Sequence, residues 1–150
     1  MTTTTDYAAL SKRLLDDLPP LQNYIGGEWT PGPTGETFMS INPATNQPIA
    51  TVHSAGRAGA QQAVIAAREA FESGAWSRMP AADRARALRR IAEQIRKRAD
   101  EISVLETSDT GIPITQIRAG QVLRAADNFD FFAEMATQIT GETFPVEGTF

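Results

Sequence analysis

The sequence has no cysteine among its 150 residues and only one histidine, His53. Without a thiol, the chain can form no disulfide, no thiolate metal site and no cysteine nucleophile. A single histidine cannot build a histidine-rich metal site. His53 also has no evident serine or cysteine that it would activate as a base. We therefore assign His53 no catalytic role.

Long apolar runs are missing as well. The first twenty residues carry acidic side chains and no continuous apolar segment, which argues against a secretory signal. No stretch approaches the roughly 18 apolar residues of a membrane span. We therefore expect a cytoplasmic protein that has no membrane partner.

Glycine-rich phosphate loops are also absent. Gly56 and Gly59 lack the third glycine that a G-x-G-x-x-G loop needs, and no Walker-type loop occurs. The sequence therefore offers no candidate residue for cofactor binding.

Charge is unevenly spread along the chain. Residues 57–100 hold ten basic and five acidic side chains, although the whole chain has a net charge of −4. This basic cluster comprises Arg84, Arg86, Arg89, Arg90, Arg96, Lys97 and Arg98. It is open to two interpretations, a phosphate-binding face or the solvated side of an amphipathic helix. Acids are interleaved with the arginines and no aromatic residue lies among them, so we favour the helix surface and expect no nucleic-acid partner.

Short strands precede long helices in the predicted order. Residues 6–17 predict a short helix that ends before Pro19-Pro20. Residues 24–29 predict a hairpin that turns at Gly26-Gly27, and strands are predicted over 37–41 and 49–52. Because every strand precedes the long helices, the chain cannot build a complete doubly wound sheet. We expect an α+β piece of a larger α/β fold that lacks the main parallel sheet, or a small α+β domain.

Three long helices are predicted after Gly56, where apolar residues recur at helical spacing. The first ends at Gly74. The second starts with Pro80 as its first residue, has a break near Asp100 and ends at Gly111. The last reaches Gly141. On this last helix Phe129, Phe132, Met135 and Ile139 share one face. Phe129 and Phe132 are expected in the core, whereas Phe131 points elsewhere, toward an interface or a tunnel.

Several segments, taken in order, resemble the aldehyde dehydrogenase family. Residues 24–29 (YIGGEW) are similar to a family hairpin, residues 40–52 to the family's Asn-Pro-Ala-Thr segment, and residues 105–111 to a segment that ends in Asp-Thr-Gly. The helix at 63–71, Trp76 and the segment 84–90 follow in the family's order and spacing. The resemblance covers residues 21–150. One departure is Asn46, which stands in place of a glycine, although Asn also tolerates the left-handed conformation.

The resemblance implies a chemistry and a domain plan. Members oxidise a small aldehyde through a Cys thioester and pass hydride to NAD or NADP, and a Glu activates the hydrolytic water. That Cys, that Glu and the cofactor loops lie downstream in the family, so this chain would contain no catalytic residue and would be inert alone. Residues 1–20 would be an N-terminal extension and residues 21–150 the first part of a nucleotide-binding domain. The rest of the enzyme chain would cover its helices, and the complete protein would be a homo-oligomer that uses NAD.

The resemblance also implies a site for a monovalent cation. Members often hold Na⁺ or K⁺ with the two residues before Asn-Pro and with the Asp of the Asp-Thr-Gly segment. Those positions are Ser40, Ile41 and Asp109 here, and hard cations do prefer oxygen ligands. The alternative is that Asp109 only caps or turns the chain before Gly111.

The segment 122–134 resembles the branch of the family that oxidises semialdehydes from aromatic-ring cleavage. In the family this helix lines the substrate tunnel. Arg124 would suit an acidic substrate, because a guanidinium binds a carboxylate as a fork. The alternative is a surface arginine paired with Asp127 or Asn128. A general or betaine-type aldehyde dehydrogenase remains a rival function, and a non-catalytic interaction or nucleic-acid module built on the basic helix is a rival of another class.

Overall fold

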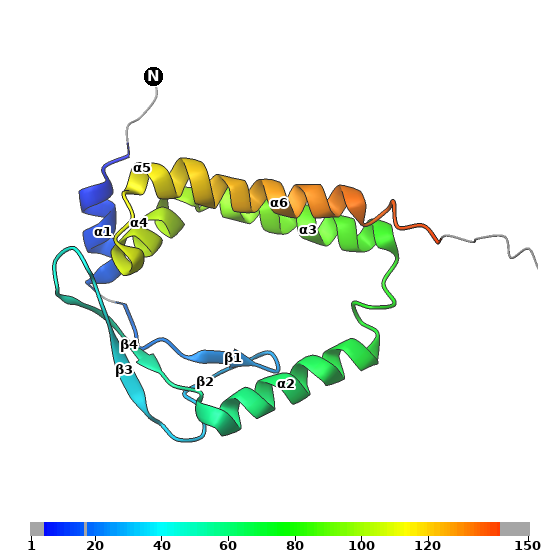
Figure 1. Ribbon diagram of the computed structural model, residues 1–150, viewed down its shortest axis with the longest axis horizontal. Coiled ribbons are helices and arrows are strands. Elements are labelled where there is room, and N and C mark those ends of the chain that lie inside the picture. Colours follow the sequence, from blue (N-terminus) through cyan, green and yellow to red (C-terminus); the bar gives the residue numbers. More distant parts are fainter. Residues whose placement is uncertain (1–4, 17, 142–150) are drawn as a thin grey trace, which may run out of the picture.

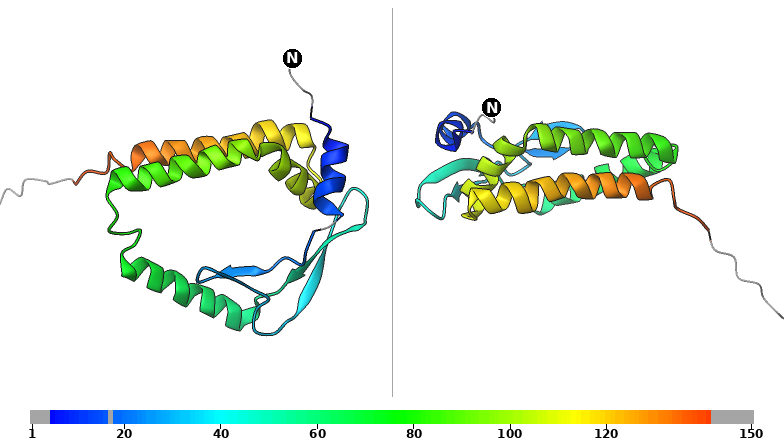
Figure 2. Two further views of the ribbon diagram at one scale, coloured as in Figure 1. Left: turned by 180° about the vertical axis from the view of Figure 1, so that it is seen from behind. Right: turned by 90° about the horizontal axis from the view of Figure 1, so that it is seen from above.

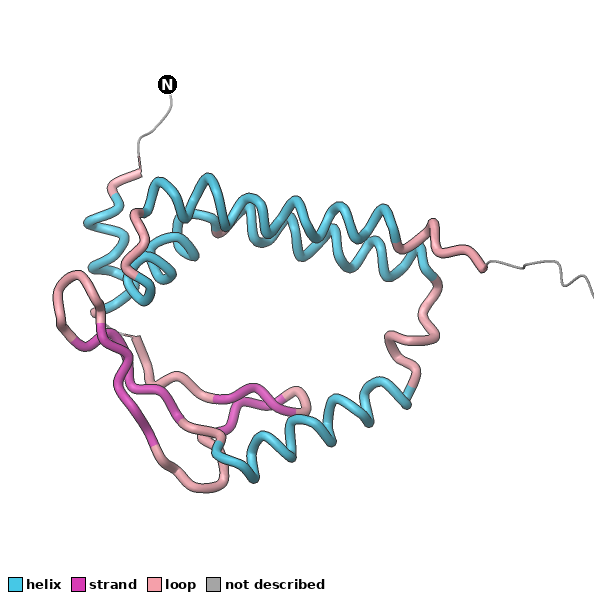
Figure 3. Tube along the Cα trace, in the orientation of Figure 1, coloured by secondary structure: helices cyan, strands magenta, loops and turns pink. Residues whose placement is uncertain are grey.

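A computed structural model describes residues 5–16 and 18–141 and shows two antiparallel hairpins among helices (Figure 1; Figure 3). Helix α1 spans Tyr7–Leu15 and is capped by Asp6, whose carboxylate accepts hydrogen bonds from the backbone of Ala8 and Ala9. Such a cap satisfies N–H groups that have no partner inside the helix. The predicted first helix is confirmed.

The strands form two separate hairpins. Strands β1 (Asn23–Ile25) and β2 (Glu28–Thr30) pair around Gly26 and Gly27, whose φ angles of 63° and 93° suit a tight hairpin turn. Strands β3 (Thr37–Ile41) and β4 (Pro48–His53) pair with an irregularity between Ser40 and Ile41. The described residues contain no strand after β4, so the helices lack a main parallel sheet, as the sequence predicted.

Helices α2 (Gly56–Ser73), α3 (Ala81–Lys97) and α4 (Ala99–Thr110) follow. Left-handed glycines end two of them: Gly74 ends α2 and Gly111 ends α4. The predicted break in the second long helix lies at Arg98, whose φ of −104° and ψ of 17° separate α3 from α4. Pro80 lies just before α3 and not in its first turn, a difference of one residue.

The last helical unit has three parts: α5 (Ile114–Gln116), a π-helical turn η1 (Ile117–Val122), and α6 (Leu123–Met135). The prediction that this helix reaches Gly141 is wrong. The β-branched residues Thr137, Ile139 and Thr140 follow α6, and β-branched residues favour helices weakly. The Thr137 hydroxyl also donates to the Glu134 carbonyl, so it occupies one of the last free carbonyls of the helix.

Helices α3 and α6 pack side by side along small residues (Figure 2). The buried residues of this interface are Ala85, Ala92, Ala126 and Ala133, each no more than 1% exposed. Phe129 is half-buried beside Ala126 and Ala133 in the α6 sequence, but Phe132 is 61% exposed, so its predicted place in the core is wrong. Phe131 is also exposed, and its ring lies edge-on against Phe132.

The remaining core is small, and the chain is open. Ala99, Ile117 and Val122 form a buried cluster that Ile95, Ile102, Ile112 and Leu123 surround. The accessible surface is 11242 Å², whereas a compact monomer of this mass exposes about 7,500 Å². Helix α2 and the β1–β2 hairpin lie apart from the α3–α6 pair (Figure 1). No described helix combines the length and the apolar character that crossing a membrane requires.

Candidate functional site

Ser40 and Asp109 meet at the junction of β3 and α4. The Ser40 hydroxyl donates a 2.6 Å hydrogen bond to Asp109 Oδ1, although 69 positions separate the two residues in the sequence. Ser40 is half-buried and Asp109 is exposed. Two of the three residues proposed for a cation are thus in contact, and Ile41 is next to Ser40 in the chain.

Two local features bring these residues together. The turn after β3 is held by Asn42, whose side-chain oxygen accepts from the backbone of Ala44 at 2.9 Å, and it closes through Asn46 at a φ of 56°. At the other side, Gly111 ends α4 so close to Pro43 that an added Cβ would lie 2.8 Å from the proline ring. A glycine is therefore needed there for both its positive φ and its contact with Pro43.

An apolar groove of about 530 Å³ lies beside this junction. It is lined by β3, β4 and α4 together with the segment before β1, and Ser40, Glu106 and Asp109 are its polar residues. Phe38, which also lines it, is 56% exposed. Three polar oxygen-bearing side chains thus border an otherwise apolar groove.

The charge of Asp109 is unfavourably placed for its helix. The carboxylate stands in the last turn of α4, which has no basic residue, and a negative charge near a helix C-terminus opposes the helix dipole. Ile41 pairs with Pro48, which has no N–H to donate to it. Carboxylate and carbonyl oxygens are the ligands that Na⁺ and K⁺ accept.

Arg124 is exposed in the first turn of α6. Within the described part of the chain, Arg124 forms no ion pair with Asp127. The Asp127 carboxylate accepts instead from Arg96 at 2.6 Å, and Asp130 accepts from the same guanidinium at 2.7 Å. Within residues 5–16 and 18–141, no ion pair of Arg124 is found.

These bonds to Arg96 also bear on the basic cluster. Arg96 is near the end of α3 and its guanidinium donates to both acids of α6, which raise its pKa. Arg86 pairs with Asp83, and Arg98 with Glu101 at 2.9 Å. Three members of the cluster are thus paired with carboxylates of the chain itself, as the interpretation of a solvated helix face predicts.

His53 ends β4 and is held through its backbone. Its N–H donates to the Leu21 carbonyl at 2.9 Å, and its carbonyl accepts from the Asn23 side chain at 3.4 Å. The imidazole Nδ1 is buried without a partner in the part of the chain that the structure describes. In that part no group of three or more His, Cys, Asp or Glu side chains could hold a metal ion.

Sequence reasoning did not identify Asp100 as a central residue. Its carboxylate accepts from Thr5 at 2.7 Å, from the Tyr7 hydroxyl at 3.2 Å and from Arg118 Nε at 2.5 Å. Arg118 and then Thr5 lower the pKa of this carboxyl, against the opposing effect of burial. The partners lie up to 95 positions away, so no local spacing could have indicated the contact.

Comparisons with known proteins decide the family. A family model described as "Aldehyde dehydrogenase family" matches residues 29–150. The chain belongs to this family. It is 40% identical over 127 residues to the 5-carboxymethyl-2-hydroxymuconate semialdehyde dehydrogenase of Escherichia coli, an alignment that covers 85% of this chain and 26% of that protein. The resemblance inferred from the motifs is confirmed.

Solved aldehyde dehydrogenases have the same fold in this region. HpcC from Thermus thermophilus superposes with a TM-score of 0.83 and 42% identity, covering 94% of this chain and 27% of that one. A variant of AldA, an indole-3-acetaldehyde dehydrogenase of P. syringae in complex with NAD⁺, superposes with a TM-score of 0.87 and 33% identity, covering 96% of this chain and 29% of that one. The chain thus spans little more than a quarter of the length of these relatives.

Proposed function

We propose that the full-length gene product that contains this chain oxidises a carboxylate-bearing semialdehyde from aromatic-ring cleavage, with NAD⁺ as oxidant. The observation that carries this proposal is the 40% identity to an enzyme named for a hydroxymuconate semialdehyde. The chain also shares 42% identity and its fold with HpcC. Family membership supplies the reaction class, and the relative's name suggests the substrate class.

NAD⁺ would accept a hydride from the substrate when bound, and a relative of the same fold binds it. This chain has no glycine-rich loop of the dinucleotide-binding type, so we assign none of its residues to the cofactor. It also has no cysteine, so the nucleophile would come from another part of the gene product. We propose that residues 21–150 are the first part of the nucleotide-binding domain, that residues 1–20 precede it, and that the complete protein is a cytoplasmic homo-oligomer.

Arg124 is the proposed contact for the substrate carboxylate. Its guanidinium is exposed, and the nearby Asp127 is bound by Arg96, which leaves Arg124 available for an external acid. A planar guanidinium can donate two parallel hydrogen bonds to one carboxylate. The position would therefore favour acidic over neutral aldehydes of similar size.

We propose further that Ser40, Ile41 and Asp109 bind K⁺ or Na⁺. Support comes from the 2.6 Å contact between Ser40 and Asp109, and from the pairing of Ile41 with a proline that cannot donate. The cation would cancel the unfavourable charge of Asp109 at the end of α4. It would thereby hold the β3–β4 hairpin against that helix.

The experiment is a steady-state assay of the purified full-length gene product. NADH formation is measured with a dicarboxylic semialdehyde and with a neutral aldehyde of similar size, and NADP⁺ replaces NAD⁺ as a control. We expect the higher kcat/KM for the acidic substrate with NAD⁺. Equal values for the two aldehydes would favour a general aldehyde dehydrogenase, and a complete lack of NADH would reject the proposal.

A further inference from the structure

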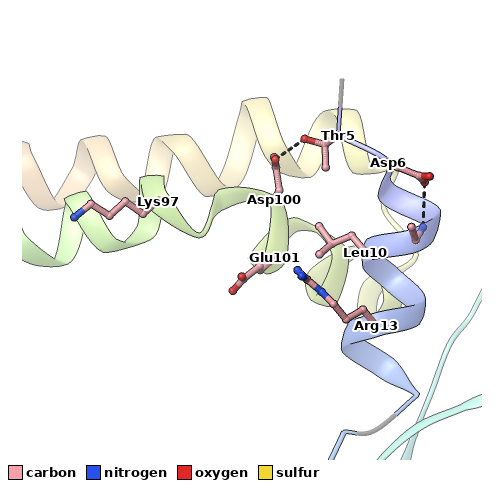
Figure 4. Close-up of a pocket in the computed structure, with 8 residues that line it drawn as sticks. Thr5, Asp6, Leu10, Arg13, Lys97, Asp100 and Glu101 are labelled. Carbon is pink, nitrogen blue, oxygen red and sulfur yellow. Dashed lines mark hydrogen bonds between the residues drawn. The ribbon is translucent and has the colours of Figure 1, made fainter. Parts of the chain in front are cut away.

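The Asp100 carboxylate joins three elements that are far apart in the sequence. It lies in the first turn of α4. Thr5, just before α1, donates to Oδ2, while Tyr7 of α1 and Arg118 of η1 donate to Oδ1. Figure 4 shows Thr5 reaching Asp100, while Lys97 extends away from them along α3. Asp100 thus connects the amino-terminal segment to the π-helical turn.

The π-helical turn itself has a definite effect on side-chain placement. Ile117 is fully buried and Val122, five positions later, is 5% exposed. In a regular α-helix the residue four positions after Ile117, which is Gln121, would share its face. The wider turn places Val122 there instead and leaves Gln121 exposed. An apolar residue therefore enters the core in place of an amide.

The extra residue in this turn rotates the side chains of α6 about the helix axis. Compared with an uninterrupted α-helix, the rotation is about 100°. Ala126 and Ala133 then face α3, where they are fully buried. Asp127 and Asp130 meet Arg96. Arg124 is left on the exposed side. The π-helical turn thus fixes the direction in which Arg124 projects.

We propose that Asp100 is a positioning residue, which holds the π-helical turn through Arg118 and so sets the rotation of α6. Tyr7 and Thr5 complete the arrangement, because they bind the carboxylate oxygens and keep Asp100 turned toward Arg118. π-Turns inside α-helices are rare and often mark functional sites. The consequence for Arg124 rests on the proposed function, whereas the support of the turn does not.

An uncharged amide could not replace this carboxylate. Three donors converge on Asp100, from a threonine hydroxyl, a tyrosine hydroxyl and a guanidinium. In D100N, one side of the side chain becomes an NH₂ group that faces a donor. Hydrogen bonds to a charged group are also stronger than those to a neutral one. D100N should therefore loosen the π-helical turn without changing the size of the side chain.

The test is amide hydrogen exchange of the full-length gene product and its D100N, R118Q and D100N/R118Q variants, followed by mass spectrometry. We expect exchange over residues 117–122 to rise about tenfold in D100N, the loss expected for one charged hydrogen bond. R118Q should act similarly, and the double variant should add little, because both changes remove the same pair. Helix α2 serves as the unaffected region.

The matched control is E101Q. Glu101 is next to Asp100 in the same turn, but it pairs with Arg98 on the surface. E101Q should leave exchange over 117–122 unchanged. The proposal is overturned if D100N leaves that exchange unchanged, if E101Q raises it equally, or if the effects of D100N and R118Q simply add.

Kinetics then test the consequence for Arg124. D100N should raise KM for the dicarboxylic semialdehyde while kcat and the KM for a neutral aldehyde stay constant. A merely structural role would lower the yield of folded protein without this separation. Faster exchange with unchanged KM would refute the link to Arg124. If the wild-type protein oxidises no aldehyde, the proposed function fails, but the exchange experiment still decides whether Asp100 holds the turn.

Discussion

Ser40 donates a 2.6 Å hydrogen bond to Asp109, and this contact ties the β3–β4 hairpin to the end of α4. If a monovalent cation shares these oxygens and supports activity, Asp109→Asn in the full-length protein should raise the concentration of K⁺ or Na⁺ needed for half-maximal activity. We expect about a tenfold rise, because a charged ligand becomes neutral. A salt titration of activity at constant ionic strength checks this. The control is Glu106→Gln, a second acid on α4 that lines the same groove. The cation site would be contradicted if both substitutions weakened the activation equally, or if Asp109→Asn left it unchanged.

Acid should remove the stabilisation that Asp100 provides. Because Arg118 and Thr5 lower the pKa of Asp100 below 3.8, its contribution is fully present above that value and is lost as pH falls through the lowered pKa. D100N should thus destabilise the protein by about 1 kcal/mol at neutral pH. The difference in the free energy of unfolding between D100N and the wild type should shrink below pH 3.8. Denaturant unfolding across this range measures it, and a constant difference at all pH values would contradict the assignment.

The interface between α3 and α6 should not tolerate larger side chains. Ala126 and Ala92 are fully buried, so Ala126→Leu should cost about 1–3 kcal/mol by overpacking. The control is Ala82→Leu, an exposed position in the first turn of α3, which should change little. Thermal unfolding of both variants compares them. A Tm for Ala126→Leu as high as that of the control would mean that the helices are not closely packed there.

The 150-residue chain expressed alone should associate. Trp29, Phe71 and Phe132 are each more than 60% exposed, and exposed apolar patches promote association. It should also produce no NADH from aldehyde and NAD⁺, since it contains no cysteine nucleophile. Light scattering and a denaturant titration test the first expectation. A monomer with a sharp cooperative transition would be evidence against the open structure.

Much of the fold was predictable because its signals are local. Gly26-Gly27, Gly74 and Gly111 each adopt positive φ where the sequence placed a turn or a helix end. Asp6 and Asn42 act on backbone groups within three residues. The Ser40–Asp109 contact was found from family resemblance and not from spacing, since the two residues are 69 positions apart.

The burial pattern of the last helix and the contacts of Asp100 depend on packing between helices, which sequence periodicity does not reveal. A regular helical period placed Phe129, Phe132, Met135 and Ile139 on one face of the last helix, with Phe129 and Phe132 in the core. The π-helical turn and the alanine contacts with α3 instead bury Ala126 and Ala133 and expose Phe132. The role of Asp100 was not predicted, because two of its three partners, Thr5 and Tyr7, lie more than 90 positions away in the sequence. Such contacts become visible only once the helices are placed.

The acidic substrate is tested most directly by Arg124→Ala in the full-length protein, assayed with a dicarboxylic semialdehyde and a neutral aldehyde of similar size. We predict that kcat/KM for the acidic substrate falls about ten- to a hundredfold, because a charge-assisted hydrogen bond is lost. It should stay nearly constant for the neutral one. Arg124→Lys should restore part of the loss, since lysine lacks the planar fork. Arg89→Ala, at an exposed arginine of α3, should change neither value. Equal losses for both aldehydes would show that Arg124 supports the helix and not the substrate, which would contradict the proposed specificity.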